Sequence, residues 1–162
     1  IPPKKPANKP IIKDTAKILP KPVIPKPKPL PPEVLKEDST PIARKMTERK
    51  RAEQSRLTID VDHIQLKLYD NGIVDNDTVS VFYNGKLLVS HQKLSEKAIE
   101  LEIQLDKTTR THEITLYAEN LGGIPPNTAL VVVTAGNKRY ELHSKASLEE
   151  NAVLVFEYEP KE

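Results

Sequence analysis

The feature that most constrains the fold is the spacing of apolar residues in the last hundred or so positions. From Leu57 onward, apolar and polar residues alternate with a period of two, the pattern of β-strands with one buried face. Ile64, Leu66 and Leu68, for example, share one face of a predicted strand. No ten-residue stretch in this region has the 3.6-residue stripe of an amphipathic helix. The sequence therefore predicts an all-β domain.

Turn residues divide this region into about eight strands, beginning with a short one at Leu57–Val61. Asn84-Gly85 and Gly136-Asn137 are dipeptides typical of tight hairpins. The segment Gly122–Asn127 contains two glycines and two prolines, so we expect an ordered crossover there. The number and spacing of the strands are typical of an antiparallel, Ig-like or jelly-roll-like β-sandwich.

Proline is concentrated at the other end of the chain, where residues 1–42 contain twelve of the fifteen prolines. Proline fixes φ and lacks an amide donor, so Pro20–Pro32 favours polyproline II over helix or strand. Forty such residues reach on the order of 100 Å. We expect a disordered, extended Pro/Lys-rich tether that acts as a spacer. Two alternatives are PxxP ligands for an aromatic groove and lysines that contact an anionic surface.

Residues 43–56 separate the tether from the predicted domain, which we place at residues 57–159. This segment, ARKMTERKRAEQSR, has good helix formers but too few apolar residues for a buried face, so it predicts a charged linker or a short helix. Net charge divides similarly, at +9 for residues 1–56 and −7 for residues 57–162. An acidic domain repels phosphate, so we expect no nucleic-acid partner.

The loop after the second predicted strand is the richest in oxygen ligands. Ca²⁺ prefers carboxylate and amide oxygens, and this loop carries four candidates, Asp70, Asn71, Asp75 and Asp77. Asp60 and Asp62 approach them if the first strand pairs alongside. The EF-hand spacing is absent, however, and the same residue types form Asx-turns in ordinary hairpin loops. Calcium binding and simple turn formation are both open interpretations.

No catalytic constellation emerges from the remaining polar residues. The chain has no cysteine and neither a G-x-S-x-G nor a glycine-rich phosphate motif. The histidines have no metal-binding spacing, and we expect His63 and His112 on outward faces. Glu149-Glu150 falls in a predicted turn, without the burial that raises a carboxyl pKa. We therefore predict no catalytic residue, no metal site with assigned ligands, no cofactor and no enzymatic activity.

Tyr69 and Phe82 fall on predicted outward phases of neighbouring strands. Coplanar aromatic side chains on a sandwich are a common way to hold sugar rings, so the pair suggests a small carbohydrate platform. The simpler interpretation is that they cover the second face of a sheet, because the chain has no Trp.

Three segments resemble a known family, namely Leu68–Ser90, Ala118–Leu142 and Asn151–Tyr158. They are similar to a β-sandwich domain that recurs in secreted, periplasmic or lipid-anchored proteins of Bacteroidota, often at the C-terminus after a low-complexity linker. Its most specific element here is the sequence IPPNTAL. The resemblance implies a sandwich architecture and an extracytoplasmic location, and it transfers no catalytic residues.

These observations lead to one main hypothesis, a non-catalytic extracytoplasmic module on a long spacer that acts in binding or scaffolding at the cell envelope. The alternatives are a calcium-stabilised structural module and a carbohydrate-binding or hydrolytic domain. We expect a monomer with a protein or glycan partner. No apolar run approaches the ~18 residues of a membrane span, so any signal peptide or lipid anchor is expected before Ile1.

Overall fold

The structure is a computed structural model that describes Pro3 and residues 40–162; the latter lie within one compact unit. The tether was predicted for residues 1–42, but its last two residues, Pro41 and Ile42, belong to a helix. Apart from these, Pro3 and Thr40, the predicted tether lies outside the described residues. One helix and nine strands follow in order: α1 (Pro41–Glu48), β1 (Lys50–Ile59), β2 (His63–Asp70), β3 (Thr78–Tyr83), β4 (Lys86–Lys93), β5 (Ile99–Gln104), β6 (Thr111–Ala118), β7 (Asn127–Ala135), β8 (Lys138–Ala146) and β9 (Glu150–Tyr158).

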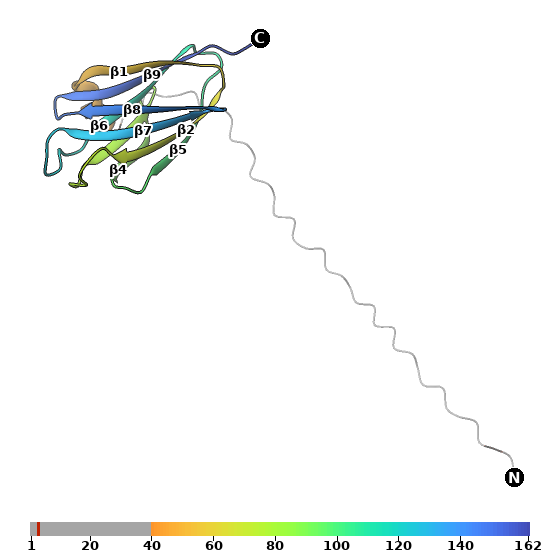
Figure 1. Cartoon of the computed structure of the whole chain (residues 1–162), viewed down its shortest axis with the longest axis horizontal. Helices are drawn as coiled ribbons and strands as arrows, with labels where there is room; N and C mark the ends of the chain where they lie inside the picture. The colour runs from red at the N-terminus through yellow and green to blue at the C-terminus, as the bar shows by residue number, and fades with distance from the viewer. Residues whose placement is uncertain (1–2, 4–39) are drawn as a thin grey trace. The chain divides into compact units, whose positions relative to one another are not determined.

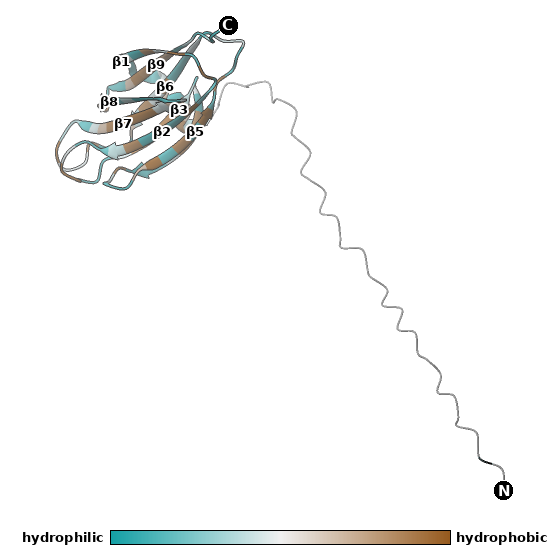
Figure 2. Cartoon of the chain, turned by 45° about the vertical axis from the view of Figure 1, so that its right-hand side comes forward, coloured by the Kyte–Doolittle hydropathy of each residue, from teal (hydrophilic) through white to brown (hydrophobic). Residues whose placement is uncertain are grey.

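The strands form two layers, which confirms the predicted all-β sandwich (Figure 1). One sheet has the order β1-β9-β6-β3-β4, and the other has the order β5-β2-β7-β8. Apolar residues recur along the strands (Figure 2) and the inward ones form one mainly aliphatic core cluster, in which Ile64, Leu66 and Leu68 of β2 are fully buried. Burial of this apolar surface is the main force that holds the two sheets together.

Both predicted hairpins are present. Asn84 and Gly85, between β3 and β4, have positive φ angles of 46° and 82°, as a two-residue turn with matching twist requires. Gly136, between β7 and β8, has a φ of 61°. At both turns the dipeptide predicted from the sequence sets the strand pairing.

The predicted start of the domain is wrong. The first strand was expected at Leu57–Val61 after a charged linker or a short helix at residues 43–56. A short helix, α1, is present and ends at Glu48, but β1 begins at Lys50 and pairs with β9 at every position except Gln54. Its charged side chains lie on the exposed side, where Arg51 and Arg56 form ion pairs with glutamates, among them Glu53. The charges therefore mark a solvated strand face, not a linker.

The sandwich is not wholly antiparallel as predicted, because β1 and β9 run parallel. Parallel neighbours need a long connection between them, and here the rest of the domain supplies it. Lys50 is paired with Glu150 and Ile59 with Tyr158, so β1 begins at the opposite end of the sandwich from the end of β9.

A bulge in β1 links the two sheets. The register with β9 shifts between Glu53 and Ser55, which leaves Gln54 out of the ladder. The Gln54 amide instead pairs with the main chain of Lys145 in β8: its Nε2 donates to the Lys145 carbonyl at 2.8 Å, and its Oε1 accepts from the Lys145 amide at 2.8 Å. One side chain thereby joins an edge strand of each sheet.

Helix α1 covers the outer face of the five-stranded sheet, although too few apolar residues for a buried face were expected. Ala43 and Met46 are buried against Phe82 and Tyr117 in a second apolar cluster. Two helical residues suffice because the sheet contributes the two aromatic rings. The helix end is fixed by Asn151, whose Nδ2 donates to the Met46 carbonyl at 2.7 Å.

Arg49, between α1 and β1, holds the helix to the sheet. Its guanidinium donates to the carbonyls of Ala118 (2.7 Å) and Ser147 (3.1 Å) and lies 3.8 Å from the centre of the Tyr117 ring. Charge-assisted hydrogen bonds and a cation–π contact together make this segment part of the folded domain.

Candidate functional site

Three carboxylates meet at one end of the sandwich. Asp70 ends β2, and Asp75 and Asp77 lie in the loop that leads to β3. Each contributes an oxygen to a group whose members all lie within 4.8 Å of one another. Figure 1 shows this loop at the same end as the crossover between β6 and β7. Three of the four candidate calcium ligands are thus brought together.

The fourth candidate, Asn71, lines the same pocket of about 240 Å³, together with Thr128 and the three aspartates. Asp60 and Asp62, which were expected to approach the loop, lie at the opposite end of β2. Asp62 forms an ion pair with Lys107 at 2.8 Å. Asp60 is likewise paired with lysines. These two carboxylates are not part of the cluster.

The crossover before β7 and the start of β7 donate main-chain hydrogen bonds to the cluster. Asp75 Oδ2 accepts from the Ile124 amide at 2.5 Å, and the Asp75 carbonyl accepts from the Gly123 amide at 2.9 Å. Asp77 Oδ2 accepts from the Thr128 amide at 3.0 Å. The acidic loop and the crossover, predicted separately as features, therefore form a single structure.

Gly122 is required where the crossover passes the carboxylates. Its φ is +56°, and a Cβ atom there would lie 2.6 Å from Asp75 Oδ1 and 2.7 Å from Asp77 Oδ1. Any larger residue would displace these side chains. The glycine was predicted only as a breaker of regular structure, because nothing in the sequence indicates which side chain it passes.

The electrostatics of the cluster are unfavourable to three negative charges. Burial raises the pKa of Asp70, and the neighbouring Asp75 carboxylate raises it further. Burial also raises the pKa of Asp77; the Thr128 amide opposes this shift, while Asp75 and Asp70 add to it. The cluster therefore favours bound protons or a bound cation over three free carboxylates.

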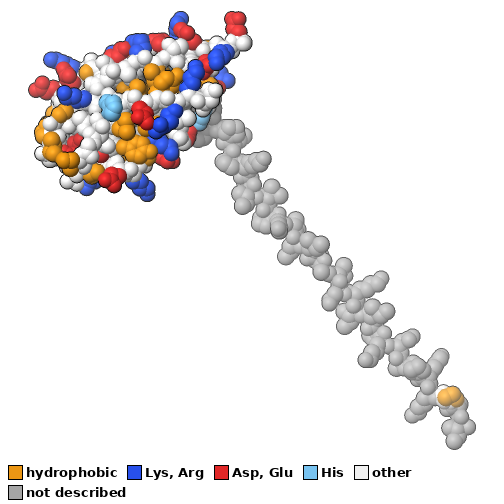
Figure 3. All heavy atoms as spheres, viewed as in Figure 1, with side chains coloured by type: hydrophobic (Ala, Val, Ile, Leu, Met, Phe, Trp, Pro, Cys, Tyr) orange, Lys and Arg blue, Asp and Glu red, His pale blue; other side chains and the backbone are white. Residues whose placement is uncertain are grey.

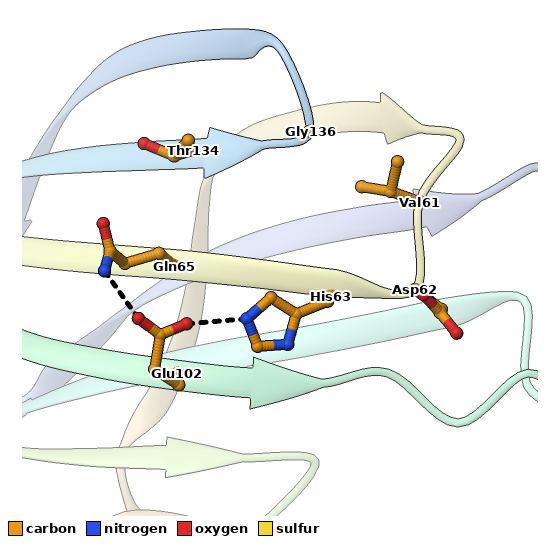
Figure 4. Close-up of a pocket in the computed structure, with 7 residues that line it drawn as sticks. All are labelled: Val61, Asp62, His63, Gln65, Glu102, Thr134 and Gly136. Atoms are coloured by element: carbon orange, nitrogen blue, oxygen red, sulfur yellow. Dashed lines mark hydrogen bonds and ion pairs between the residues drawn. The ribbon is translucent and has the colours of Figure 1, made fainter.

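A second, shallow pocket lies at the other end of β2 (Figure 4). His63 Nε2 lies 2.7 Å from Glu102 Oε2, and Gln65 Nε2 donates to Glu102 Oε1 at 2.5 Å. His63 is exposed on an outward face, as predicted. The hydrogen bond from Gln65 and the contact with His63 lower the pKa of Glu102. Thr134 also lines this pocket, but its hydroxyl forms no hydrogen bond with His63 or Glu102, whose side chains bond each other and Gln65.

His112 is fully buried, and its predicted outward orientation is wrong. Its Nε2 lies 2.9 Å from the Thr109 carbonyl and its Nδ1 lies 2.8 Å from the Tyr83 hydroxyl. With Nε2–H donating to the carbonyl, Nδ1 accepts from the hydroxyl. The signal was present in the sequence, because His112 shares the period-two phase of Ile114. It is a core histidine, satisfied at both nitrogens.

The expected aromatic platform is not formed. Phe82 is fully buried in the cluster beneath α1, and Tyr69 belongs to β2 in the other sheet. Glu149 and Glu150 are exposed where β9 begins; their amides donate to Ser147 Oγ at 3.1 and 3.0 Å.

Comparison with known proteins gave no match to a family model, a curated protein or a solved structure. Among residues 40–162, no helix is long and apolar enough to cross a membrane. Lys and Arg side chains are interspersed with Asp and Glu on the face shown in Figure 3.

Proposed function

We propose that residues 40–162 form a non-catalytic extracytoplasmic module that acts in binding or scaffolding at the cell envelope, with a protein or glycan partner. The Pro/Lys-rich residues before it serve as the spacer. The observation that carries the scaffolding role is the parallel pairing of β1 with β9. The location rests on the sequence resemblance to secreted and lipid-anchored Bacteroidota domains.

The parallel pair suits a module that bears load between its two ends. The chain enters β1 at Lys50 and leaves β9 after Tyr158 at the opposite end of the sandwich. A pull between the two ends therefore loads the β1–β9 ladder in shear, so its hydrogen bonds must break together. A hairpin pulled open from one end breaks its hydrogen bonds one at a time.

The polar groups of the domain support a structural role in a second way. His112 and Tyr83 form a hydrogen bond with each other in the interior, and the Arg49 guanidinium donates hydrogen bonds to two main-chain carbonyls. In the acidic cluster, the Asp75 and Asp77 carboxylates likewise accept from the main-chain amides of Ile124 and Thr128. These arrangements favour binding and scaffolding over turnover.

Single-molecule force spectroscopy tests the scaffolding proposal. The chain has no cysteine, so handles can be attached at introduced ones without background. We expect a chain pulled from its two ends to unfold at substantially higher force than the same domain pulled between Ile124→Cys and Leu148→Cys. Both residues are exposed, and they flank one end of the β7–β8 hairpin, so this pull opens the hairpin progressively.

Equal unfolding forces in the two directions would contradict the load-bearing role. Chemical denaturation of the doubly substituted chain is the control, because an unchanged midpoint shows that the handles have not weakened the domain. Forced unfolding reports the unfolding rate, so the comparison is made at one loading rate.

A further inference from the structure

We propose that Asp70, Asp75 and Asp77 bind a divalent cation, Ca²⁺ in preference to Mg²⁺. The site lies at the corner where the β2–β3 loop meets the crossover before β7. This inference goes beyond the proposed function and does not depend on it. The sequence leaves two interpretations of the loop open, calcium binding and simple turn formation, and this inference favours calcium binding.

The first argument is a buried carboxylate oxygen that has no partner. Asp77 is only 2% exposed, and its Oδ1 has no hydrogen-bond donor, although Oδ2 accepts from Thr128. Asp70 Oδ2 is also buried and unpartnered. Leaving such atoms unsatisfied is costly, so their presence calls for a ligand. A cation satisfies both oxygens without requiring a hydrogen-bond donor from the protein.

The second argument is that the three carboxylates converge. Asp75 Oδ2 accepts from the Ile124 amide in the crossover, and Asp77 Oδ2 accepts from the Thr128 amide at the start of β7. Both Oδ1 atoms face Gly122, whose missing side chain leaves room for them. With the two carboxylates oriented in this way, one oxygen from each of Asp70, Asp75 and Asp77 lies within 4.8 Å of the others.

The third argument is uncompensated charge. None of the ion pairs within residues 40–162 involves Asp70, Asp75 or Asp77. Asp60 and Asp62, at the other end of β2, each have a lysine partner. Three carboxylates without a cationic side chain leave a strong negative potential, which a divalent ion neutralises.

The donor set selects a hard cation. The pocket offers carboxylates together with the amide oxygen of Asn71 and the hydroxyl of Thr128, and no histidine or cysteine lines it. Zinc favours nitrogen and sulfur ligands, whereas Ca²⁺ takes six to eight oxygens in flexible geometry and Mg²⁺ requires a strict octahedron. Loop carboxylates with water in the remaining positions fit Ca²⁺ best. We expect a dissociation constant on the order of 10⁻⁴ M, within the range of extracellular calcium-binding modules.

A cation at this corner would join three parts of the fold. Asp70 belongs to β2 in the four-stranded sheet, and Asp77 immediately precedes β3 in the five-stranded sheet. Asp75 accepts from the Ile124 amide of the crossover, and Asp77 accepts from the Thr128 amide of β7. Binding would therefore stabilise the packing of one sheet against the other as well as the loop itself.

Thermal unfolding of the full chain, after removal of metals with EGTA, tests this proposal. Adding CaCl2 at about 100 times the dissociation constant is expected to raise Tm by roughly 10 °C, and MgCl2 at the same ionic strength by clearly less. Isothermal titration with CaCl2 should show one site per chain. Absence of a Ca²⁺-dependent shift, or an equal or larger shift with Mg²⁺, would overturn the proposal.

Substitutions locate the site. Asp77→Asn is expected to abolish the Ca²⁺ shift, whereas Asp62→Asn, which removes the same charge at the other end of β2, should retain it. If Asp77→Asn does not fold, Asp75→Asn decides, since an asparagine oxygen can still accept from the Ile124 amide. A full Ca²⁺ shift in the Asp75 or Asp77 variant would exclude these carboxylates as ligands.

The pH dependence separates a bound cation from bound protons. Because burial raises the pKa of Asp77 in the folded state, protonation favours folding. The metal-free chain should therefore gain stability relative to Asp77→Asn as pH falls through that raised pKa, and lose it again as pH rises. Saturating Ca²⁺ should reverse this trend near neutral pH. A chain stabilised by acid but never by Ca²⁺ would show that protons alone occupy the cluster.

Discussion

A chain that begins at Leu57 is expected not to fold. It lacks α1 and residues 50–56, the first seven of β1, which pair with the beginning of β9. It also exposes Phe82 and Tyr117 and leaves the Asn151 side chain without the Met46 carbonyl. We expect the loss to exceed about 5 kcal/mol, comparable to the whole stability of a small domain.

Urea unfolding followed by circular dichroism measures this effect. A chain that begins at Thr40 keeps every described contact of the helix and is the matched control, expected to unfold at the same midpoint as the full chain. A cooperative transition of unchanged midpoint in the chain from Leu57 would show that α1 and the start of β1 are dispensable. That result would restore the charged-linker interpretation of residues 43–56.

The second large effect is expected at Phe82. Replacing this fully buried ring with alanine leaves a cavity between the sheet and α1 and should cost about 3–5 kcal/mol of unfolding free energy. Tyr69→Ala, at a half-exposed position of the other sheet, should cost about 1 kcal/mol. Denaturant midpoints at constant m-value give both numbers.

The same pair of variants tests the carbohydrate-platform alternative. If Phe82 were a sugar-binding residue, Phe82→Ala would leave stability unchanged and reduce binding on a glycan array. Phe82→Leu keeps most of the buried volume and is the variant to use if the alanine form does not fold.

Much of the fold followed from local patterns in the sequence. The hairpins at Asn84-Gly85 and Gly136-Asn137 need positive φ angles that few other residues adopt, so they were recognisable without any tertiary information. The alternation of aliphatic residues in β2 likewise identified its buried face, because alternate side chains lie on opposite faces of a strand and only one of these faces is apolar.

The start of the domain could not be predicted in the same way. Residues 50–56 have good helix formers and many charges, so their local preference opposes the strand they form. Pairing with β9, far away in sequence, overrides that preference. The parallel direction of this pair could not be predicted either, because sequence patterns indicate where strands lie but not which strands pair.

The acidic cluster was predictable by residue type but not by geometry. Aspartates in the loop suggested both calcium and Asx-turns, and only the fold shows Asp77 to be buried with a free oxygen. The contact of Gly122 with two of these carboxylates joins segments about fifty residues apart along the chain. Nothing in a single sequence connects them.

The central claim, a tethered module that works at the cell envelope, is tested most directly in the source cells. Protease is added to intact cells, to cells with a permeabilised outer layer and to full lysates, and residues 40–162 are followed with an antibody. We predict that the tether is cut, releasing the folded domain, before the cytoplasmic membrane is broken, while a cytosolic marker stays intact. A chain that remains uncut until that membrane is lysed would contradict the account.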